Sequence, residues 1–307
     1  MQDILVLHDE VAQAKSEHRA VVALESTLLA HGMPAHRRME VAAQLNAAVR
    51  AEGAVPAVIA VVDGRIRVGL DDAALEQLCL APTVHKTAER DLSFAVATGG
   101  HHATTVSSTM WVAHRAGIDV FATGGVGGVH RDAEETFDES QDLRALATHP
   151  VAVVSAGAKA ILDLRRTVER LETLGVAVVG FGTPEFPAFY TRTSGIPLEH
   201  VVADVAALAR VVHARLHTLR QGGILICNPV PAEHEMDDAL LDAALGKVLA
   251  DAKAHGIHGK ALTPRLLAAM EQATGGESVR VNIALAENNA RLGARLAVAL
   301  CQLGAPR

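Results

Sequence analysis

The sequence predicts an α/β protein with a three-layer α/β/α fold and a largely parallel, mixed central sheet. Apolar runs of strand length alternate along the chain with helical stretches, an order typical of a parallel sheet covered by helices on both faces. Half of the 307 residues are hydrophobic and only 3% are aromatic, so Ala, Val and Leu dominate the core. Because no linker composition or internal repeat divides the chain, we expect a single domain over residues 1–307.

In the first part of the chain, turn and cap residues separate the expected elements. Asp63-Gly64 stands between two β-rich runs and is a hairpin signal. Asp71 is expected to cap the helix that follows the hairpin. The expected elements are a short helix at 8–18, a strand at 19–24, a loop at 28–34, a helix at 37–52, the hairpin at 55–70 and a helix ending at Leu80.

The rest of the chain continues the alternation. Polar loops with a helix near 107–116 occupy 84–117, and a strand in 117–125 runs into a glycine-rich turn. The remaining expected elements are a strand, tight turn and helix in 150–174, a strand and long loop in 175–197, a helix near 200–221, a strand ending at Asn228-Pro229, a helix at 232–255 and two helices in 256–301.

Charge and composition exclude several classes of protein. A net charge of −7 without a dense Lys/Arg run argues against a nucleic-acid-binding surface. The sequence contains no uninterrupted apolar run of about 18 residues, so we expect no membrane span. The N-terminus lacks the layout of a signal peptide, so we expect a cytoplasmic protein. The three cysteines form no CxxC pair, which excludes a zinc ribbon.

Polar residues follow several of the predicted strands, and ligands of parallel sheets bind at that edge. Lys159 follows the apolar run VAVVS in a turn of small residues or the first turn of a helix. A helix N-terminus and a desolvated cleft would both favour its neutral, nucleophilic amine, although a surface lysine at a helix start is the plainer alternative. Glu25 directly follows the strand at 19–24 and is a candidate general acid or, alternatively, a helix cap.

Two further segments suggest an anion and a cation site. The loop TGGVGGVHR at 123–131 has two glycine pairs followed by His130 and Arg131, which could approach phosphate oxygens, but it matches no nucleotide-binding motif. The acidic segment at 132–142 offers one or two oxygen ligands for Mg²⁺ or Mn²⁺, with a solvated acidic face explaining its other members. Lys86 and Arg90 would add cations for an anionic substrate.

The order of the motifs resembles that of pseudouridine-5′-phosphate glycosidases, the indigoidine synthase A-like family. The resemblance extends over about residues 8–302. The motifs that carry it are ALESTLLAHGMP, KTAERDL, ATTVSSTM, FATGGVGGVHR, TFDESQDL, VVSAGAKAILDL, NPVP and TGGESVRVNIALAENNA. The resemblance implies reversible cleavage of pseudouridine 5′-phosphate to uracil and ribose 5-phosphate, a homotrimer, and a divalent cation, Mn²⁺ or alternatively Mg²⁺.

The resemblance also implies roles for single residues. Lys159 would form a Schiff base with the ring-opened sugar, Glu25 would move a proton to or from uracil, and Asp138 would be the metal ligand. The implied substrate contacts are Lys86, Val106, His130, Ser140, Gln141, Asp142 and Asn282. A two-carboxylate glycosidase scheme suits a C-glycosidic bond poorly, because the bond has no leaving oxygen or nitrogen.

The sequence departs from the family pattern at two positions, and it leaves two alternative functions open. Ala88 and Gln141 stand where relatives often carry other residues, which affects the expected substrate contacts. A class I aldolase acting on a sugar phosphate would also need an amine, a phosphate site and an acid. A non-catalytic sugar-phosphate-binding protein could use the same scaffold.

Overall fold

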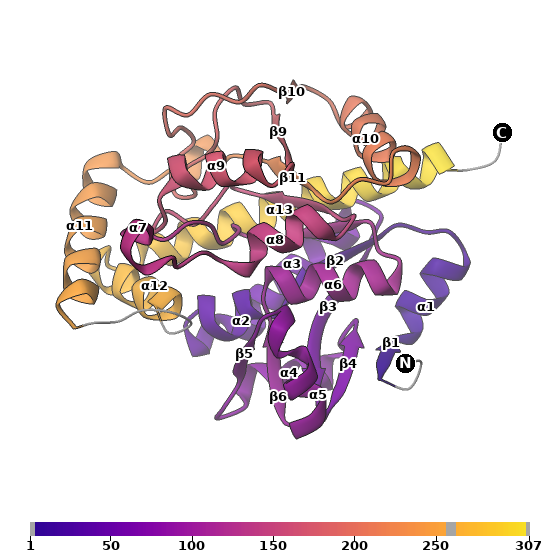
Figure 1. The fold of residues 1–307 in the computed structure, drawn as a ribbon. Helices are drawn as coiled ribbons and strands as arrows, with labels where there is room; N and C mark the ends of the chain where they lie inside the picture. The colour runs from indigo at the N-terminus through magenta and orange to yellow at the C-terminus, as the bar shows by residue number, and fades with distance from the viewer. Residues whose placement is uncertain (1–3, 256–261, 305–307) are drawn as a thin grey trace.

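The protein forms one α/β unit around a single mixed sheet (Figure 1). The computed structural model describes residues 4–255 and 262–304. Within these residues the strands are β1 (Leu5–Leu7), β2 (Val21–Glu25), β3 (Val55–Val62), β4 (Arg65–Val68), β5 (His85–Thr87), β6 (His101–Thr104), β7 (Val120–Ala122), β8 (Ala152–Ser155), β9 (Ala177–Phe181), β10 (Val201–Val202) and β11 (Ile224–Cys227).

The described strands pair in the order β1-β4-β3-β2-β7-β8-β11-β9-β10, with β6 joining β3 to β5. Among the described strands, only the β3–β4 and β3–β6 pairs are antiparallel. The first half of β3 pairs with β2 as far as Ile59, and its last three residues pair with β6. The chain therefore leaves the sheet at Glu25, in the middle of a continuous β-surface. The largely parallel, mixed sheet predicted from the sequence is confirmed.

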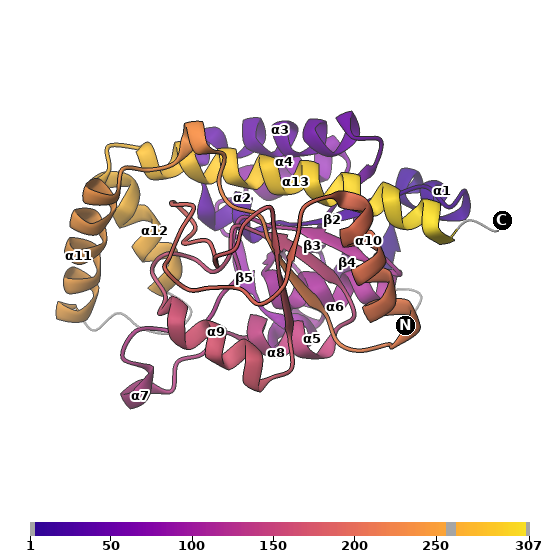
Figure 2. The same ribbon diagram turned by 90° about the horizontal axis from the view of Figure 1, so that it is seen from above.

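Helices cover both faces of this sheet, which gives the expected three layers. Figure 2 shows α3 and α13 on one side of the strands and α6, α8 and α9 on the other. The helices are α1 (Asp9–Ser16), α2 (Thr27–Gly32), α3 (Arg38–Ala51), α4 (Asp72–Leu80), α5 (Leu92–Thr98), α6 (Val106–Ala116), α7 (Ala133–Thr136), α8 (Gln141–Thr148), α9 (Leu164–Thr173), α10 (Val205–His213), α11 (Asp238–Ala254), α12 (Leu262–Ala273) and α13 (Glu277–Gly304).

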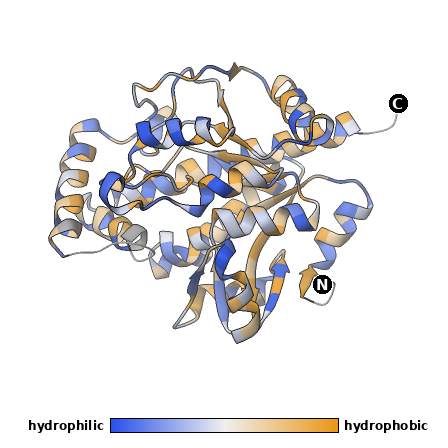
Figure 3. Cartoon of the chain, in the orientation of Figure 1, coloured by the Kyte–Doolittle hydropathy of each residue, from blue (hydrophilic) through white to orange (hydrophobic). Residues whose placement is uncertain are grey.

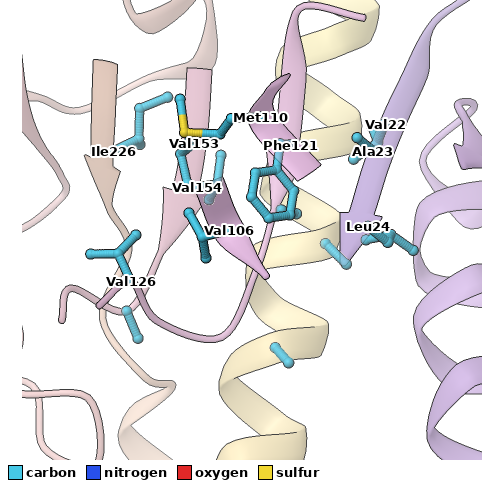
Figure 4. Close-up of a cluster of buried hydrophobic side chains, with 14 of the residues drawn as sticks. Val22, Ala23, Leu24, Val106, Met110, Phe121, Val126, Val153, Val154 and Ile226 are labelled. Carbon is cyan, nitrogen blue, oxygen red and sulfur yellow. The ribbon is translucent and has the colours of Figure 1, made fainter. Parts of the chain in front are cut away.

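The core lies between the layers and consists largely of small aliphatic side chains. The central strands are strongly hydrophobic (Figure 3), and β2, β3, β8 and β11 are buried along their whole length. Figure 4 shows Phe121 of β7 among aliphatic side chains such as Val153 and Met110. None of the described helices is long and apolar enough to cross a membrane.

Three local predictions were wrong. The segment at 28–34, expected to be a loop, is mostly helix α2, since Leu29 and Ala30 are buried in the core. The polar segment at 84–104 contains β5, α5 and β6, because its short strands are stabilised by pairing with each other and with β3 rather than by their own composition. The tight turn after β8 does not lead directly into a helix, as described below.

Candidate active site

A cavity of about 190 Å³ lies at the carboxyl ends of β2, β7 and β8. The ten residues to which the resemblance assigns a role all line it, although they come from six separate segments of the chain. They are Glu25, Lys86, Val106, His130, Asp138, Ser140, Gln141, Asp142, Lys159 and Asn282. Arg131, also expected to approach a phosphate, is exposed and is not one of the lining residues. The edge of the sheet predicted to bind a ligand is therefore the edge where these side chains meet.

Glu25 is the last residue of β2 and is buried, with 6% of its surface exposed. The Thr123 hydroxyl donates a hydrogen bond to its carboxyl group. Burial raises the pKa of Glu25 above its ordinary value, while the nearby Lys159 charge and the Thr123 hydrogen bond act in the opposite direction. A carboxyl group that holds its proton above its ordinary pKa is suited to donate it.

The backbone of Lys159 is held by the glycine-rich loop that follows β7. The parallel pairing of β7 and β8 continues past both strand ends through hydrogen bonds from the Val126 N–H to the Gly157 carbonyl (3.0 Å) and from the Lys159 N–H to the Val126 carbonyl (3.1 Å). Helix α9 begins only at Leu164. Of the two positions expected for Lys159, the turn of small residues is therefore confirmed and the first turn of a helix is wrong, because pairing with a distant segment keeps this turn extended.

The side chain of Lys159 is directed to the same loop. Its Nζ donates to the Gly125 carbonyl at 2.7 Å. The side chain also lies close enough to Glu25 for its charge to oppose the rise in the pKa of that carboxyl group. The half-buried amine and the buried carboxyl group thus share one cavity. Together they offer a nucleophile and a proton donor.

Asp142 braces the glycine-rich loop against helix α6. Its two carboxylate oxygens accept hydrogen bonds from the Ser107 and Gly127 backbone N–H groups, both at 2.9 Å. A Cβ atom added to Gly127 would lie 2.3 Å from the Ser140 hydroxyl oxygen, so only glycine fits at this position. Since the Gly127 N–H already donates to Asp142, this N–H is not one that the loop offers to a phosphate group.

The remaining polar residues line the cavity from three sides. Lys86 comes from β5, Gln141 from the start of α8, and His130 from the loop after β7. Burial lowers the pKa of His130, with the Asp138 carboxylate acting in the opposite direction. The Gln141 side-chain oxygen accepts from the Arg90 backbone N–H at 3.3 Å, and Val106 is the first residue of α6.

Asp138 is the candidate metal ligand, and its half-buried side chain lines the cavity. Among the described residues, no three His, Cys, Asp or Glu side chains form a preformed metal cage. A single carboxylate suits a divalent ion that keeps several waters and takes further oxygens from a substrate, which is the usual behaviour of Mg²⁺. The donor set at Asp138 fits an ion of this kind and does not fit a structural metal centre.

Helix α13 closes the cavity and supports the glycine-rich loop. Asn282 lines the cavity, and its buried Oδ1 has no hydrogen-bond partner among the described residues. About two helical turns further along α13, Asn289 donates to the Thr123 carbonyl at 2.8 Å and accepts from Asn228 at 3.0 Å. Asn228, which the sequence placed at a strand end, therefore supports the loop and is not one of the residues that line the cavity.

Several lining residues were not among the candidates from the sequence, and two of them, His31 and Phe189, carry rings. His31 lies on α2, and its buried Nε2 has no hydrogen-bond partner among the described residues; burial and the Lys86 and Arg38 charges lower its pKa to about 4. Phe189 comes from the long loop after β9. The motif AHGMP signalled the first of these, whereas no local pattern distinguishes Phe189 from the other aromatic residues.

A buried carboxyl group and a lysine amine that share a cavity at the carboxyl edge of a parallel sheet define this protein as an α/β enzyme. The chain belongs to the indigoidine synthase A-like protein family, whose model matches residues 10–299. The matched range includes all of the segments that line the cavity.

Relatives of similar length support the assignment. Proteins named pseudouridine-5′-phosphate glycosidase are 50% identical in Caldanaerobacter subterraneus, over 99% of both chains, and 50% identical in Paracoccus denitrificans, over 98% of this chain and 99% of the relative. The relative of that name in Methylobacterium nodulans is 53% identical over 95% of this chain and 86% of its own length.

Two solved structures share the fold. The prealnumycin C-glycosynthase AlnA, in complex with ribulose 5-phosphate, is 38% identical with a TM-score of 0.90 over 98% of both chains. An indigoidine synthase A-like protein from Thermotoga maritima is 32% identical with a TM-score of 0.88 over 97% of both chains.

Proposed function

We propose that this protein is a C-glycosidase that reversibly cleaves pseudouridine 5′-phosphate to uracil and ribose 5-phosphate. The observation that carries the proposal is the pairing of buried Glu25 with the amine of Lys159 in one cavity. The names of relatives that are about half identical over nearly the whole chain support the choice of substrate. The structure of AlnA with ribulose 5-phosphate supports a sugar phosphate as one of the ligands.

The proposed chemistry uses the amine to break a carbon–carbon bond. The sugar ring opens as the bond from the anomeric carbon to the ring oxygen breaks. The Lys159 amine bonds to the anomeric carbon, and a proton passes from the nitrogen to the freed oxygen. The nitrogen lone pair then forms the C=N bond while the bond from the anomeric carbon to C5 of uracil breaks, and C5 takes a proton from Glu25. Water hydrolyses the resulting imine, which releases ribose 5-phosphate and restores the amine.

The other lining residues would bind and orient the substrate. Lys86, His130 and Ser140 supply positive charge and hydrogen-bond donors for the phosphate and sugar oxygens. Asp138 would hold a divalent cation, which we propose to be Mn²⁺, and a bound ion would polarise substrate oxygens. Asn282, with its buried Oδ1 lacking a partner among the described residues, would hydrogen-bond the substrate.

Assembly and location follow from the resemblance and the substrate. We propose a homotrimer, which light scattering of the purified protein would test directly. A nucleoside phosphate is charged and stays inside the cell that makes it, so we place the enzyme in the cytoplasm.

The decisive experiment follows uracil release from pseudouridine 5′-phosphate with Mn²⁺, with and without a chelator. We expect release by the wild-type protein and loss of release in Lys159→Ala. Lys247→Ala, which removes an exposed lysine on α11, is the matched control and should retain activity. Retro-aldol cleavage of sugar phosphates without uracil release would favour the aldolase alternative, and binding without turnover would favour the binding-protein alternative.

Borohydride reduction tests the covalent step separately. With ribose 5-phosphate, the wild-type protein should gain the mass of the reduced adduct, and the peptide that carries the added mass should contain Lys159. A Lys159→Ala protein that still traps the sugar phosphate at another lysine would contradict the assignment of the nucleophile.

A further inference from the structure

Phe189 combines an unusual backbone conformation with a place in the cavity wall. Its φ of 71° lies in the left-handed region, which bulky side chains rarely adopt, and only 2% of its surface is exposed. A residue held in this region persists only where its surroundings determine the conformation, and such residues concentrate at functional sites. Phe189 also lines the cavity that contains Lys159.

The surroundings that hold Phe189 are the two loops that position Lys159. Its neighbour Ala188 forms an antiparallel bridge with Gly157, in the turn that precedes the lysine. Its ring packs edge-on against Tyr190, with the ring centroids 4.8 Å apart. The ring also lies directly on Gly125, because a Cβ atom added to this glycine would be 2.6 Å from two of the ring carbons.

This contact affects the lysine through the backbone of the glycine-rich loop. The Gly125 carbonyl is the group that accepts the hydrogen bond from Lys159 Nζ, at 2.7 Å. A ring pressed against the Gly125 Cα restricts rotation of the adjacent peptide and so fixes the direction of this carbonyl. The same apolar ring keeps water from this side of the cavity wall, beside the amine.

We propose that Phe189 is a positioning residue for Lys159. Its ring holds the Gly125 carbonyl so that one N–H of the neutral amine is bonded and the lone pair faces the anomeric carbon of the substrate. This inference rests on the proposed function, because it assumes that the Lys159 amine is the nucleophile. The residue acts through Gly125 and takes no part in the bonds that form and break.

The first test compares Phe189→Leu with Phe186→Leu. Phe186 is in the same loop and fully buried, but it is not one of the residues that line the cavity, so it is the matched control. We expect Phe189→Leu to lower kcat at least about tenfold with little change in KM, since small misplacements of a reacting group cost up to about 100-fold. No such loss is expected in Phe186→Leu.

The second test does not depend on the folding of a single variant. Gly125→Ala places a methyl group against the ring, so it should displace the ring and lower the trapping rate. In the double variant Gly125→Ala/Phe189→Leu the smaller side chain makes room for the methyl group. We therefore expect the double variant to be at least as active as Gly125→Ala alone.

The outcomes separate this inference from the proposed function. A wild-type protein that neither releases uracil nor traps ribose 5-phosphate would refute the proposed function itself. A normal wild-type protein with an unchanged kcat in Phe189→Leu, and with additive losses in the double variant, would overturn only the role of Phe189.

Discussion

Replacing Glu25 by Gln tests the proton donor while leaving the shape of the site almost unchanged. The Gln side chain keeps an oxygen that can accept the hydrogen bond from Thr123, but it has no acidic proton. A positioned general acid contributes about 10²- to 10⁴-fold to a rate. We therefore expect Glu25→Gln to lower kcat for uracil release by about that factor, with a smaller effect on KM.

The same substitution should change how stability depends on pH. Burial raises the pKa of Glu25 in the folded protein above that in the unfolded chain, so the folded state holds a proton that the unfolded chain releases. This contribution to stability is complete below the unfolded pKa and is lost as pH rises through the folded pKa. Each pKa unit of separation corresponds to about 1.4 kcal/mol. Gln does not titrate, so the variant should gain stability relative to wild type as pH rises.

Two measurements check this reasoning. Chromatographic uracil release across pH should show an alkaline fall for wild type that is absent from the residual activity of Glu25→Gln. Urea unfolding at acidic and alkaline pH should show the relative stabilisation, with exposed Glu76→Gln on α4 as the control. Activity of Glu25→Gln within tenfold of wild type, or an equal pH dependence of stability in both proteins, would refute the role of Glu25 as a buried acid.

Three further substitutions test the frame of the site. Asp142→Asn retains only one oxygen acceptor for the Ser107 and Gly127 N–H groups, so urea unfolding should show a free energy of unfolding lower by about 3 kcal/mol. An unchanged midpoint would contradict the role of Asp142 in holding the glycine-rich loop. Gly157→Ala forces a Cβ to 2.3 Å from a carbonyl oxygen at a φ of +80°, and calorimetry should show a destabilisation of about 2–4 kcal/mol, with wild-type stability as the refuting result. Asp138→Asn should weaken activation by Mn²⁺ at least about tenfold in a metal titration, and identical titration curves would remove Asp138 as the ligand.

Around Lys159, the structure agrees with part of the prediction and differs from the rest. The apolar run before it and the small residues around it predicted a strand and a turn, both are present, and Lys159 lines the cavity. The alternative position in the first turn of a helix is wrong, since α9 starts at Leu164. Local sequence could not show that the glycine-rich loop, more than thirty residues away, pairs with this turn. For the same reason no local pattern indicated that Asp142 accepts hydrogen bonds from two backbone N–H groups.

The sequence by itself determined the fold class and the edge of the sheet where the site lies. Both depend on local patterns, namely the alternation of apolar runs with helices and the polar residues that end each strand. Only the tertiary structure decided how the site residues are held. The pairing of Lys159 with the glycine-rich loop, the burial of Glu25 and the contact of Phe189 with Gly125 all join segments far apart in the chain. Contacts of this kind arise from packing, and packing depends on the position of every layer at once.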